Sequence, residues 1–192
     1  MLIGLVRHGQ TDWNVEGRLQ GQTDIPLNAE GVKQAEALAN RLSSERPMWD
    51  AVLSSDLMRA YCTAEIIAEA LGIPLLAGEK RLRERGFGEC EGLLRSEREE
   101  RWGLGWAELA PGIESDEAVR ARGMQVIEEL RKNQRGKNIL IVTHGSFLAQ
   151  MLAALCPELE DERISNLSYS IVEWQEQGWK PLLHNCTAHL AQ

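Results

Sequence analysis

The chain has 192 residues, a formal net charge of −8 and only 4 cysteines. That length is enough for one domain with a full hydrophobic core, so we expect a single domain over residues 1–192 with one active centre. The negative charge would repel nucleic acid and anionic membrane surfaces, which excludes both as general partners. Any anion that the protein binds must therefore meet a local cluster of positive side chains.

The cysteines and the apolar runs indicate a cellular compartment. The cysteines are far apart and form no C-x-x-C pair, which favours reduced thiols in a cytosol over a zinc or redox motif. The first apolar run is short and has no basic lead-in, and polar residues interrupt the apolar stretch 139–156. We therefore expect a cytoplasmic protein without a membrane span.

Two hydrophobic periodicities alternate along the chain. Short runs rich in Ile, Val and Leu predict strands covered on both faces, at residues 2–6, 49–53, 73–76 and 138–143. Amphipathic patterns predict helices at residues 29–42, 56–72 and 116–132. The expected caps are Asn28, Asp56 and Ser115 at the starts and Gly72 at the end of the second helix.

This alternation predicts an α/β fold, with a mostly parallel central sheet and helices on both of its faces. Residues 171–174 and 179–184 predict a hairpin at one sheet edge. In such sheets, ligands bind outside the carboxyl ends of the strands. We therefore look for functional side chains where the predicted strands end.

The stretch from about residue 93 to 112 is the least regular, and it is too small for a core of its own. We interpret it as a short insertion over the sheet edge, with a lid as one interpretation. Its arginines could serve a second anionic group, and its tryptophans could select an organic leaving group. These residues are Arg95, Arg98, Arg101, Trp102 and Trp106.

Two histidines follow predicted strands in the same way. Arg7-His8-Gly9 alone is as typical of a hydrogen-bonded structural histidine as of a catalytic one. His144 and Gly145, however, repeat the order of apolar strand, histidine, glycine and helix. Two imidazoles and the amide groups of two helix starts should therefore converge on one pocket, where backbone N–H groups can approach an anion.

A phosphoryl group suits such a pocket, because its charge is spread over several oxygens and its transfer depends on matched donors. Arg7 is one such donor, and Arg59 is a second candidate, although alone it is equally typical of a solvated helix charge. Arg59 shares a helix stripe with Thr63. His8 has the ordinary imidazole pKa near 6.5, so it could be a nucleophile at neutral pH without a metal. A leaving oxygen also needs a proton donor, and spacing does not choose among Glu79, Glu84, Glu89 and Glu91.

Several segments, in order, resemble the histidine phosphatase superfamily in its phosphoglycerate mutase-like branch (branch 1). They are VRHGQTDWN, LQGQTDIPLN, SSDLMRAYCTA, RLRERGFGECEG, PGIES, IVTHG, ISNLSYS and NCTAHL. The resemblance implies a three-layer α/β/α sandwich and a phosphohistidine intermediate. The sequence departs from the family at Ile113, where glycine is frequent, and Gly123 costs its helix about 1 kcal/mol relative to alanine unless packing requires it.

The resemblance also implies roles for particular residues. His8 would be the nucleophile, Arg7 and Arg59 the phosphate clamp, and His144 an electrostatic stabiliser. Glu84 would protonate the leaving oxygen and then activate water; the resemblance alone selects it. Further contacts to phosphate or to the His8 loop are expected from Thr11, Asn14, Gln20, Gly21, Glu114 and Gly145.

Three activities remain open. The short insertion and RAYCTA resemble phosphatases, whereas Glu84-Arg85 resembles the glutamate-arginine pair of the mutases. A binding or regulatory protein without turnover is a third alternative. We favour a metal-independent phosphatase that hydrolyses a small phosphorylated metabolite through a phosphohistidine and needs no cofactor, with phosphoglycerate mutase as the alternative.

Overall fold

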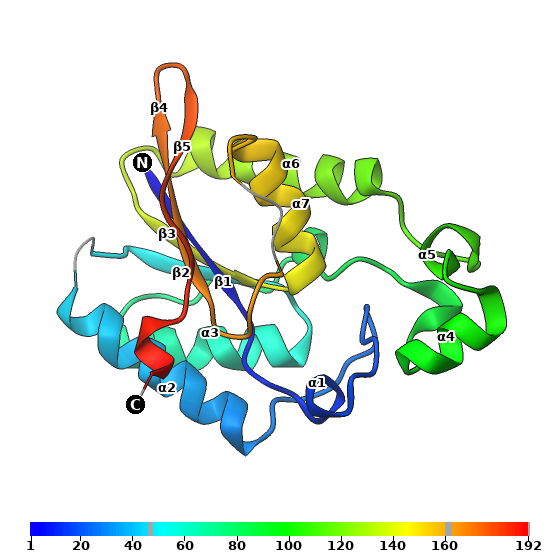
Figure 1. Cartoon of the computed structure of the whole chain (residues 1–192). Helices are drawn as coiled ribbons and strands as arrows, with labels where there is room; N and C mark the ends of the chain where they lie inside the picture. Colours follow the sequence, from blue (N-terminus) through cyan, green and yellow to red (C-terminus); the bar gives the residue numbers. More distant parts are fainter. Residues whose placement is uncertain (46–47, 160–162, 192) are drawn as a thin grey trace.

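The computed structural model describes residues 1–45, 48–159 and 163–191 (Figure 1). Its sheet has the order β2-β3-β1-β4-β5. β1 pairs in parallel with β3, which pairs in parallel with β2, whereas β4 is antiparallel to both β1 and β5. Only β4 therefore runs against the others, which confirms a mostly parallel sheet. The strands are β1 (Leu2–Arg7), β2 (Ala51–Ser54), β3 (Ile139–Thr143), β4 (Tyr169–Gln175) and β5 (Gly178–Cys186).

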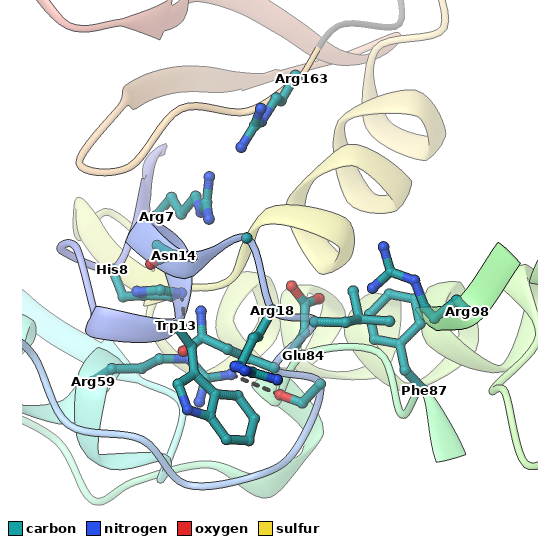
Figure 2. Close-up of a pocket in the computed structure, with 14 residues that line it drawn as sticks. Arg7, His8, Trp13, Asn14, Arg18, Arg59, Glu84, Phe87, Arg98 and Arg163 are labelled. Atoms are coloured by element: carbon teal, nitrogen blue, oxygen red, sulfur yellow. Dashed lines mark hydrogen bonds between the residues drawn. The ribbon is translucent and has the colours of Figure 1, made fainter. Parts of the chain in front are cut away.

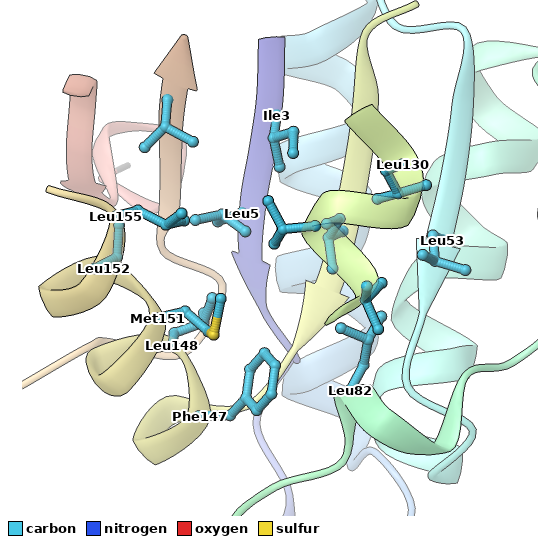
Figure 3. Close-up of a cluster of buried hydrophobic side chains, with 14 of the residues drawn as sticks. Ile3, Leu5, Leu53, Leu82, Leu130, Phe147, Leu148, Met151, Leu152 and Leu155 are labelled. Atoms are coloured by element: carbon cyan, nitrogen blue, oxygen red, sulfur yellow. The ribbon is translucent and has the colours of Figure 1, made fainter. Parts of the chain in front are cut away.

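Helices cover both faces of the sheet, as Figure 1 shows. Helices α2 (Ala29–Ser44) and α3 (Met58–Leu71) pack on one face, and α6 (Asp116–Asn133) and α7 (Gly145–Leu155) pack on the other. Alternate strand residues enter the two cores: Leu5 faces α6 and α7 (Figure 3), whereas Val6 faces α2 and α3. The predicted α/β/α sandwich is confirmed.

The remaining helical segments are short. They are α1 (Asp12–Glu16), α4 (Arg95–Trp102), α5 (Trp106–Leu109) and three single 3-10 turns at Lys80–Leu82, Gly88–Cys90 and Ala188–Leu190. Helices α4 and α5 occupy the irregular stretch 93–112, where Trp102 and Trp106 pack around buried Phe87 and Cys90. The function of this stretch as a lid stays a prediction.

Three of the four predicted helix caps are confirmed. Asn28 accepts a hydrogen bond from the backbone N–H of Gly31, Ser115 accepts one from Ala118, and Gly72 has a left-handed φ of 63°. The prediction for Asp56 was wrong: its carboxylate binds the Arg83 guanidinium through two hydrogen bonds of 2.7 Å. 

The cap of α3 comes from elsewhere in the chain. The carboxylate of Asp24 accepts the backbone N–H of Met58 at 2.7 Å, which satisfies an amide that has no partner inside the helix. The start of α3 is thereby joined to the loop that follows α1.

The predicted strand at residues 73–76 was also wrong. Only Leu75 forms an isolated bridge, with Val52 of β2. Pro74 has no backbone N–H to donate to a ladder, which explains why its apolar neighbours do not extend into a strand.

The predicted hairpin, by contrast, is present as β4 and β5, and both strands are longer than predicted. No helix within the described ranges combines the length and apolar character needed to cross a membrane.

Candidate active site

The two strand-end histidines meet at one edge of the sheet. β1 ends at Arg7 and β3 at Thr143, so His8 and His144 directly follow neighbouring parallel strands. The backbone N–H of His8 donates to the carbonyl of Thr143 at 2.9 Å, and the two imidazole centroids are 5.2 Å apart. The parallel register therefore brings the two histidines side by side, as predicted. Only His8 lines the cavity at this edge of the sheet, so the prediction that both imidazoles meet one pocket holds for His8 and not for His144.

Hydrogen bonds define the tautomer of His8. Its Nδ1 lies 2.6 Å from the carbonyl oxygen of Gly9, and Nε of Arg59 lies 3.3 Å from its Nε2. A carbonyl oxygen only accepts and a guanidinium only donates, so the proton belongs on Nδ1 and the lone pair on Nε2. The ring is 2% exposed. Burial, followed by the charges of Arg59 and Arg7, holds the pKa of His8 well below its ordinary value, so the ring is neutral at neutral pH.

His144 is fully buried beside it. Among the described residues, neither of its ring nitrogens has a hydrogen-bond partner. Burial is the largest cause that holds the pKa of His144 well below its ordinary value, followed by the charge of Arg59. A buried polar group without a partner is costly, so these nitrogens are groups that a bound anion or water would satisfy.

Arg7 extends from the end of β1 toward the start of α7. Its Nη1 donates to the carbonyl of Ile164 at 2.7 Å, while its Nε is buried without a partner in the described chain. A Cβ at Gly145 would lie 3.2 Å from that Nε, so glycine leaves room for the guanidinium. Burial lowers the pKa of Arg7 to about 10, against the opposing charge of Glu84. Arg7 therefore remains a cation at neutral pH.

Arg59 is fully buried at the first turn of α3, which rules out a solvated helix charge. Two of its nitrogens donate to backbone carbonyls, Nη1 to Thr23 at 2.9 Å and Nη2 to Gly21 at 2.7 Å. Burial lowers its pKa to about 10, and Glu84 again opposes the shift. The guanidinium is thus held charged and in one orientation against Nε2 of His8.

Backbone N–H groups hold the carboxylate of Glu84 at the start of α7. Oε1 accepts from Phe147 at 2.8 Å and from Arg85 at 2.9 Å, and Oε2 accepts from Ser146 at 3.1 Å. Oε2 therefore accepts from one backbone N–H and Oε1 from two, which leaves Oε2 more free to meet a ligand. The positive end of the α7 dipole also lies beside this carboxylate.

The other candidate glutamates have different surroundings. Glu79 pairs with Arg81, and Glu91 accepts from the backbone N–H groups of Gln22, Thr23 and Phe87. Glu89 is exposed. Of these four glutamates, Glu84 is the one that lines the cavity beside His8, a distinction that spacing in the sequence left open.

Arg7, His8, Arg59 and Glu84 line a cavity of about 210 Å³, shown in Figure 2. An adjoining cavity of about 410 Å³ extends along the start of α7 and shares five lining residues with the first. Positive charge dominates the first cavity, because five arginines and a single carboxylate line it. These are Arg7, Arg18, Arg59, Arg98, Arg163 and Glu84. The cavity is therefore suited to an anion, although the whole chain carries a net charge of −8.

The loop after β1 supports this cavity. The Thr11 hydroxyl donates to Oε1 of Gln20 at 2.9 Å, and the Thr11 backbone N–H donates to Oδ1 of Asn14 at 3.1 Å. Asn14, Gln20 and Gly21 all line the cavity. Because the Asn14 oxygen accepts from the Thr11 backbone N–H and from the side-chain amide of Asn166, the amide nitrogen of Asn14 is the group that remains for a ligand.

A segment before β4 braces the same loop from the other side. The side-chain amide of Asn166 donates to the carbonyls of His8 and Gly9 at 3.1 and 3.3 Å. The backbone N–H of Leu167 donates to the carbonyl of Arg7 at 3.1 Å. Leu167 itself has a left-handed backbone conformation, with a φ of +50°. Sequence reasoning missed Asn166, since no spacing relates it to His8.

Aromatic residues near the cavity differ from the prediction. Trp13 and Phe87 line it, whereas Trp102 and Trp106 do not. Sequence reasoning missed Trp13 and Phe87 because their positions depend on how two distant loops meet.

Among the arginines of the 93–112 stretch, only Arg98 lines the cavity. Its guanidinium lies 4.3 Å from the Trp106 ring centroid, and its Nε is buried without a partner within the described ranges. Arg95 instead pairs with Glu99 at the surface.

The contact expected for Glu114 is absent, and Arg85 of the mutase-like pair points elsewhere. Glu114 does not contact the His8 loop, because its carboxylate accepts the backbone N–H of Gly86 and pairs with Arg122. Arg85 does not line the cavity, because its guanidinium binds the Glu114 carbonyl and the Asp116 carboxylate. Within residues 1–45, 48–159 and 163–191, no cluster of three or more His, Cys, Asp or Glu side chains could hold a metal.

The fold thus brings two histidines, buried arginines and one carboxylate together, a set of groups suited to an anion such as a phosphoryl group. The sequence profile of the histidine phosphatase superfamily (branch 1) matches residues 3–187. The chain belongs to this superfamily.

Its relatives include phosphatases and mutase-like proteins. An uncharacterized phosphatase of Bacillus subtilis, PhoE, is 35% identical over 98% of this chain and 96% of its own. A metal-independent phosphoserine phosphatase of Arabidopsis thaliana is 36% identical over 92% of this chain and 78% of its own, and a probable phosphoglycerate mutase of Escherichia coli, GpmB, is 36% identical over 92% and 86%.

The structural comparison agrees with the sequence comparison. A mycobacterial glucosyl-3-phosphoglycerate phosphatase, solved with VO3, superposes with a TM-score of 0.84. It is 30% identical to this chain, and the match covers 96% of this chain and 99% of that one. The relatives thus act in phosphoryl chemistry.

Proposed function

We propose that the protein is a phosphatase that hydrolyses a small phosphomonoester through a phosphohistidine on His8. The observation that carries this proposal is the fixed tautomer of His8, whose Nε2 lone pair lies beside Arg59 in an arginine-lined cavity. A neutral imidazole with its lone pair toward the anion site is the form that attacks phosphorus.

In the first step, Nε2 of His8 bonds to phosphorus while the bond from phosphorus to the ester oxygen breaks. Arg7 and Arg59 balance the charge on the phosphoryl oxygens, aided by the amide of Asn14 and by His144. Glu84, protonated on Oε2, gives its proton to the leaving oxygen, and the alcohol departs.

In the second step, the Glu84 carboxylate takes a proton from water. The hydroxide bonds to phosphorus, the bond from phosphorus to Nε2 breaks, and His8 returns to its starting form with Glu84 protonated again. The products are the alcohol and inorganic phosphate. No step requires a metal, since imidazole and guanidinium groups supply the nucleophile and the charge balance.

Two features favour hydrolysis over mutase activity. Arg85, the second member of the mutase-like pair, is bound to the 114–116 segment rather than to the cavity. Glu84 lies between the two adjoining cavities and lines both, so space for water exists beside it. The similarity to phosphatases from a bacterium and a plant supports the same choice.

Brief mixing with a ³²P-labelled phosphomonoester, with chelator present, tests the intermediate. We expect acid-labile, alkali-stable label on the native protein and none on His8→Ala, because only the first has the nucleophile. As a control, His184→Asn should label normally, since β5 lies at the far edge of the sheet from β2 and its histidine does not line the cavity. Label on His8→Ala, or no turnover by the folded native protein on a panel of phosphate esters, would contradict the proposal.

A further inference from the structure

We propose that Thr63 is a positioning residue that ties the nucleophile loop to the phosphate clamp, an inference that rests on the proposed function. Thr63 lies in α3, one turn after Arg59, and its side chain is fully buried. It does not line the cavity, so any effect on the reaction must pass through its neighbours.

The hydroxyl of Thr63 has two partners with defined directions. It donates to the carbonyl of Arg59 at 2.7 Å, four residues earlier in the helix. Its single proton is thereby used, so its oxygen accepts the backbone N–H of Gly9 at 3.1 Å. One hydroxyl thus joins α3 to the residue that follows His8.

These two hydrogen bonds complete a closed ring of four hydrogen bonds. Nδ1–H of His8 donates to the Gly9 carbonyl, the Gly9 N–H donates to Thr63, Thr63 donates to the Arg59 carbonyl, and Nε–H of Arg59 donates to Nε2 of His8. Every donor and acceptor in the ring is used in one consistent direction. The ring therefore fixes both the tautomer of His8 and the position of Arg59 relative to it.

Packing leaves the Gly9 peptide little room to move. A Cβ on Gly9 would lie 2.5 Å from the carbonyl oxygen of Gly31, so the backbones of the His8 loop and of α2 are in close contact. Gly9, Arg59 and Thr63 are all buried, which excludes water as a replacement partner at the surface. If the hydroxyl were removed, the Gly9 N–H would stay buried without a partner.

Thr63 becomes most important when phosphorylation of His8 opens the ring of hydrogen bonds. A phosphoryl group on Nε2 occupies the position to which Nε–H of Arg59 donates, so that bond is lost in the phosphoenzyme. The remaining three bonds do not involve Nε2. Thr63 is then the remaining connection between the phosphorylated imidazole of His8 and Arg59, and it keeps the two aligned for attack by water.

Two substitutions separate this role from simple packing. Thr63→Val keeps the shape but removes the hydroxyl, and we expect kcat to fall between about 10- and 100-fold with little change in KM. Thr63→Ser keeps the hydroxyl and should retain kcat close to the native value. Ser43→Ala is the control: it removes the same type of helix hydrogen bond, to Ala39 in α2, without a contact to the His8 loop, and should leave kcat unchanged.

A spectroscopic measurement of the His8 tautomer tests the ring of hydrogen bonds directly. It requires no turnover, so it separates this inference from the proposed function. ¹⁵N chemical shifts of the histidine ring should place the proton on Nδ1 of His8 in the native protein and in Thr63→Ser. In Thr63→Val, a second population with the proton on Nε2 should appear. A folded Thr63→Val protein with native kcat, or with reduced kcat but the native tautomer, would overturn the inference.

If Thr63→Val does not fold, hydrogen exchange of the native protein decides the matter. The Gly9 amide should exchange slowly in the free protein and remain slow when vanadate fills the anion site, because its bond to Thr63 persists. Fast exchange of this amide in either state would overturn the inference. Absence of phosphohistidine in the labelling experiment, with slow Gly9 exchange, would instead refute the proposed function alone.

Discussion

Nε2 of His8 is the atom on which the proposed chemistry depends. Burial by itself only makes the ring neutral; the contact of Nδ1 with the Gly9 carbonyl adds the choice of tautomer. A buried histidine with the opposite tautomer would present an N–H to the anion site and could not attack phosphorus. The neighbouring glycine is thus important for its carbonyl as well as for its missing side chain.

At the same scale, Glu84→Gln tests the proton donor. Glutamine has a similar shape but cannot give a proton, so kcat/KM for an alkyl phosphate should fall between about 10²- and 10⁴-fold. For 4-nitrophenyl phosphate, whose leaving group hardly needs a proton, the loss in kcat/KM should be much smaller. Kinetics on both substrates measure the contrast, with exposed Glu89→Gln as the control. Equal losses on both substrates would remove Glu84 from this role.

At the scale of the elements, helix α7 connects the site to the core. Its first turn supplies two backbone N–H groups to Glu84, and its Gly145 allows Arg7 to approach. Further along, Phe147 and Met151 pack against α6 (Figure 3). A displacement of α7 would therefore move the general acid and the clamp together.

Gly123 on α6 tests that packing. A Cβ at this position would clash with Sδ of Met151 and lie 2.8 Å from Cζ of Phe147. Alanine improves helix propensity by about 1 kcal/mol, but overpacking costs about 1–3 kcal/mol, so we expect Gly123→Ala to destabilise the fold by up to about 2 kcal/mol. Urea unfolding measures the change, with Gln125→Ala on the exposed face as the control. A gain in stability would show that α6 and α7 separate easily.

At the scale of the whole molecule, the fold gathers like charges that would repel one another in isolation. Burial lowers the pKa values of Arg7 and Arg59, yet both remain charged at neutral pH. Burial also lowers the pKa values of His8 and His144, and these two side chains are neutral. The sandwich thus gathers positive charge at a cost in folding free energy, which a bound anion would offset.

Stability should consequently depend on pH. The pKa values of His8 and His144 are depressed in the folded state, so below about pH 6.5 the unfolded chain takes up protons that the folded protein does not. As the pH falls from about 6.5, each imidazole should lower the free energy of unfolding with a slope that approaches about 1.4 kcal/mol per pH unit. Urea unfolding at pH 7.5 and 5.5 measures this, and His8→Asn should lose less stability than the native protein. Identical losses in both proteins would contradict the buried, neutral state of His8.

Local signals predicted most of the sheet and its main helices. The apolar runs of β1 and β3 are unambiguous because both faces of these strands are covered, and the caps Asn28 and Ser115 each accept from a backbone N–H three residues further on. Asp56 failed as a cap because a distant guanidinium, Arg83, competes for its carboxylate. The strand at residues 73–76 failed because apolar periodicity does not register the missing N–H of a proline.

The sequence by itself determined that histidines follow strands β1 and β3, because covalent order and hydrophobic pattern locate the end of each strand. It could not choose Glu84 from its neighbours or bring Thr63, Asn166 and Arg98 to their positions, because those choices depend on side chains from distant elements that meet only in the folded chain. Parallel pairing of the strands decided that the two imidazoles would lie side by side, and burial decided their charge.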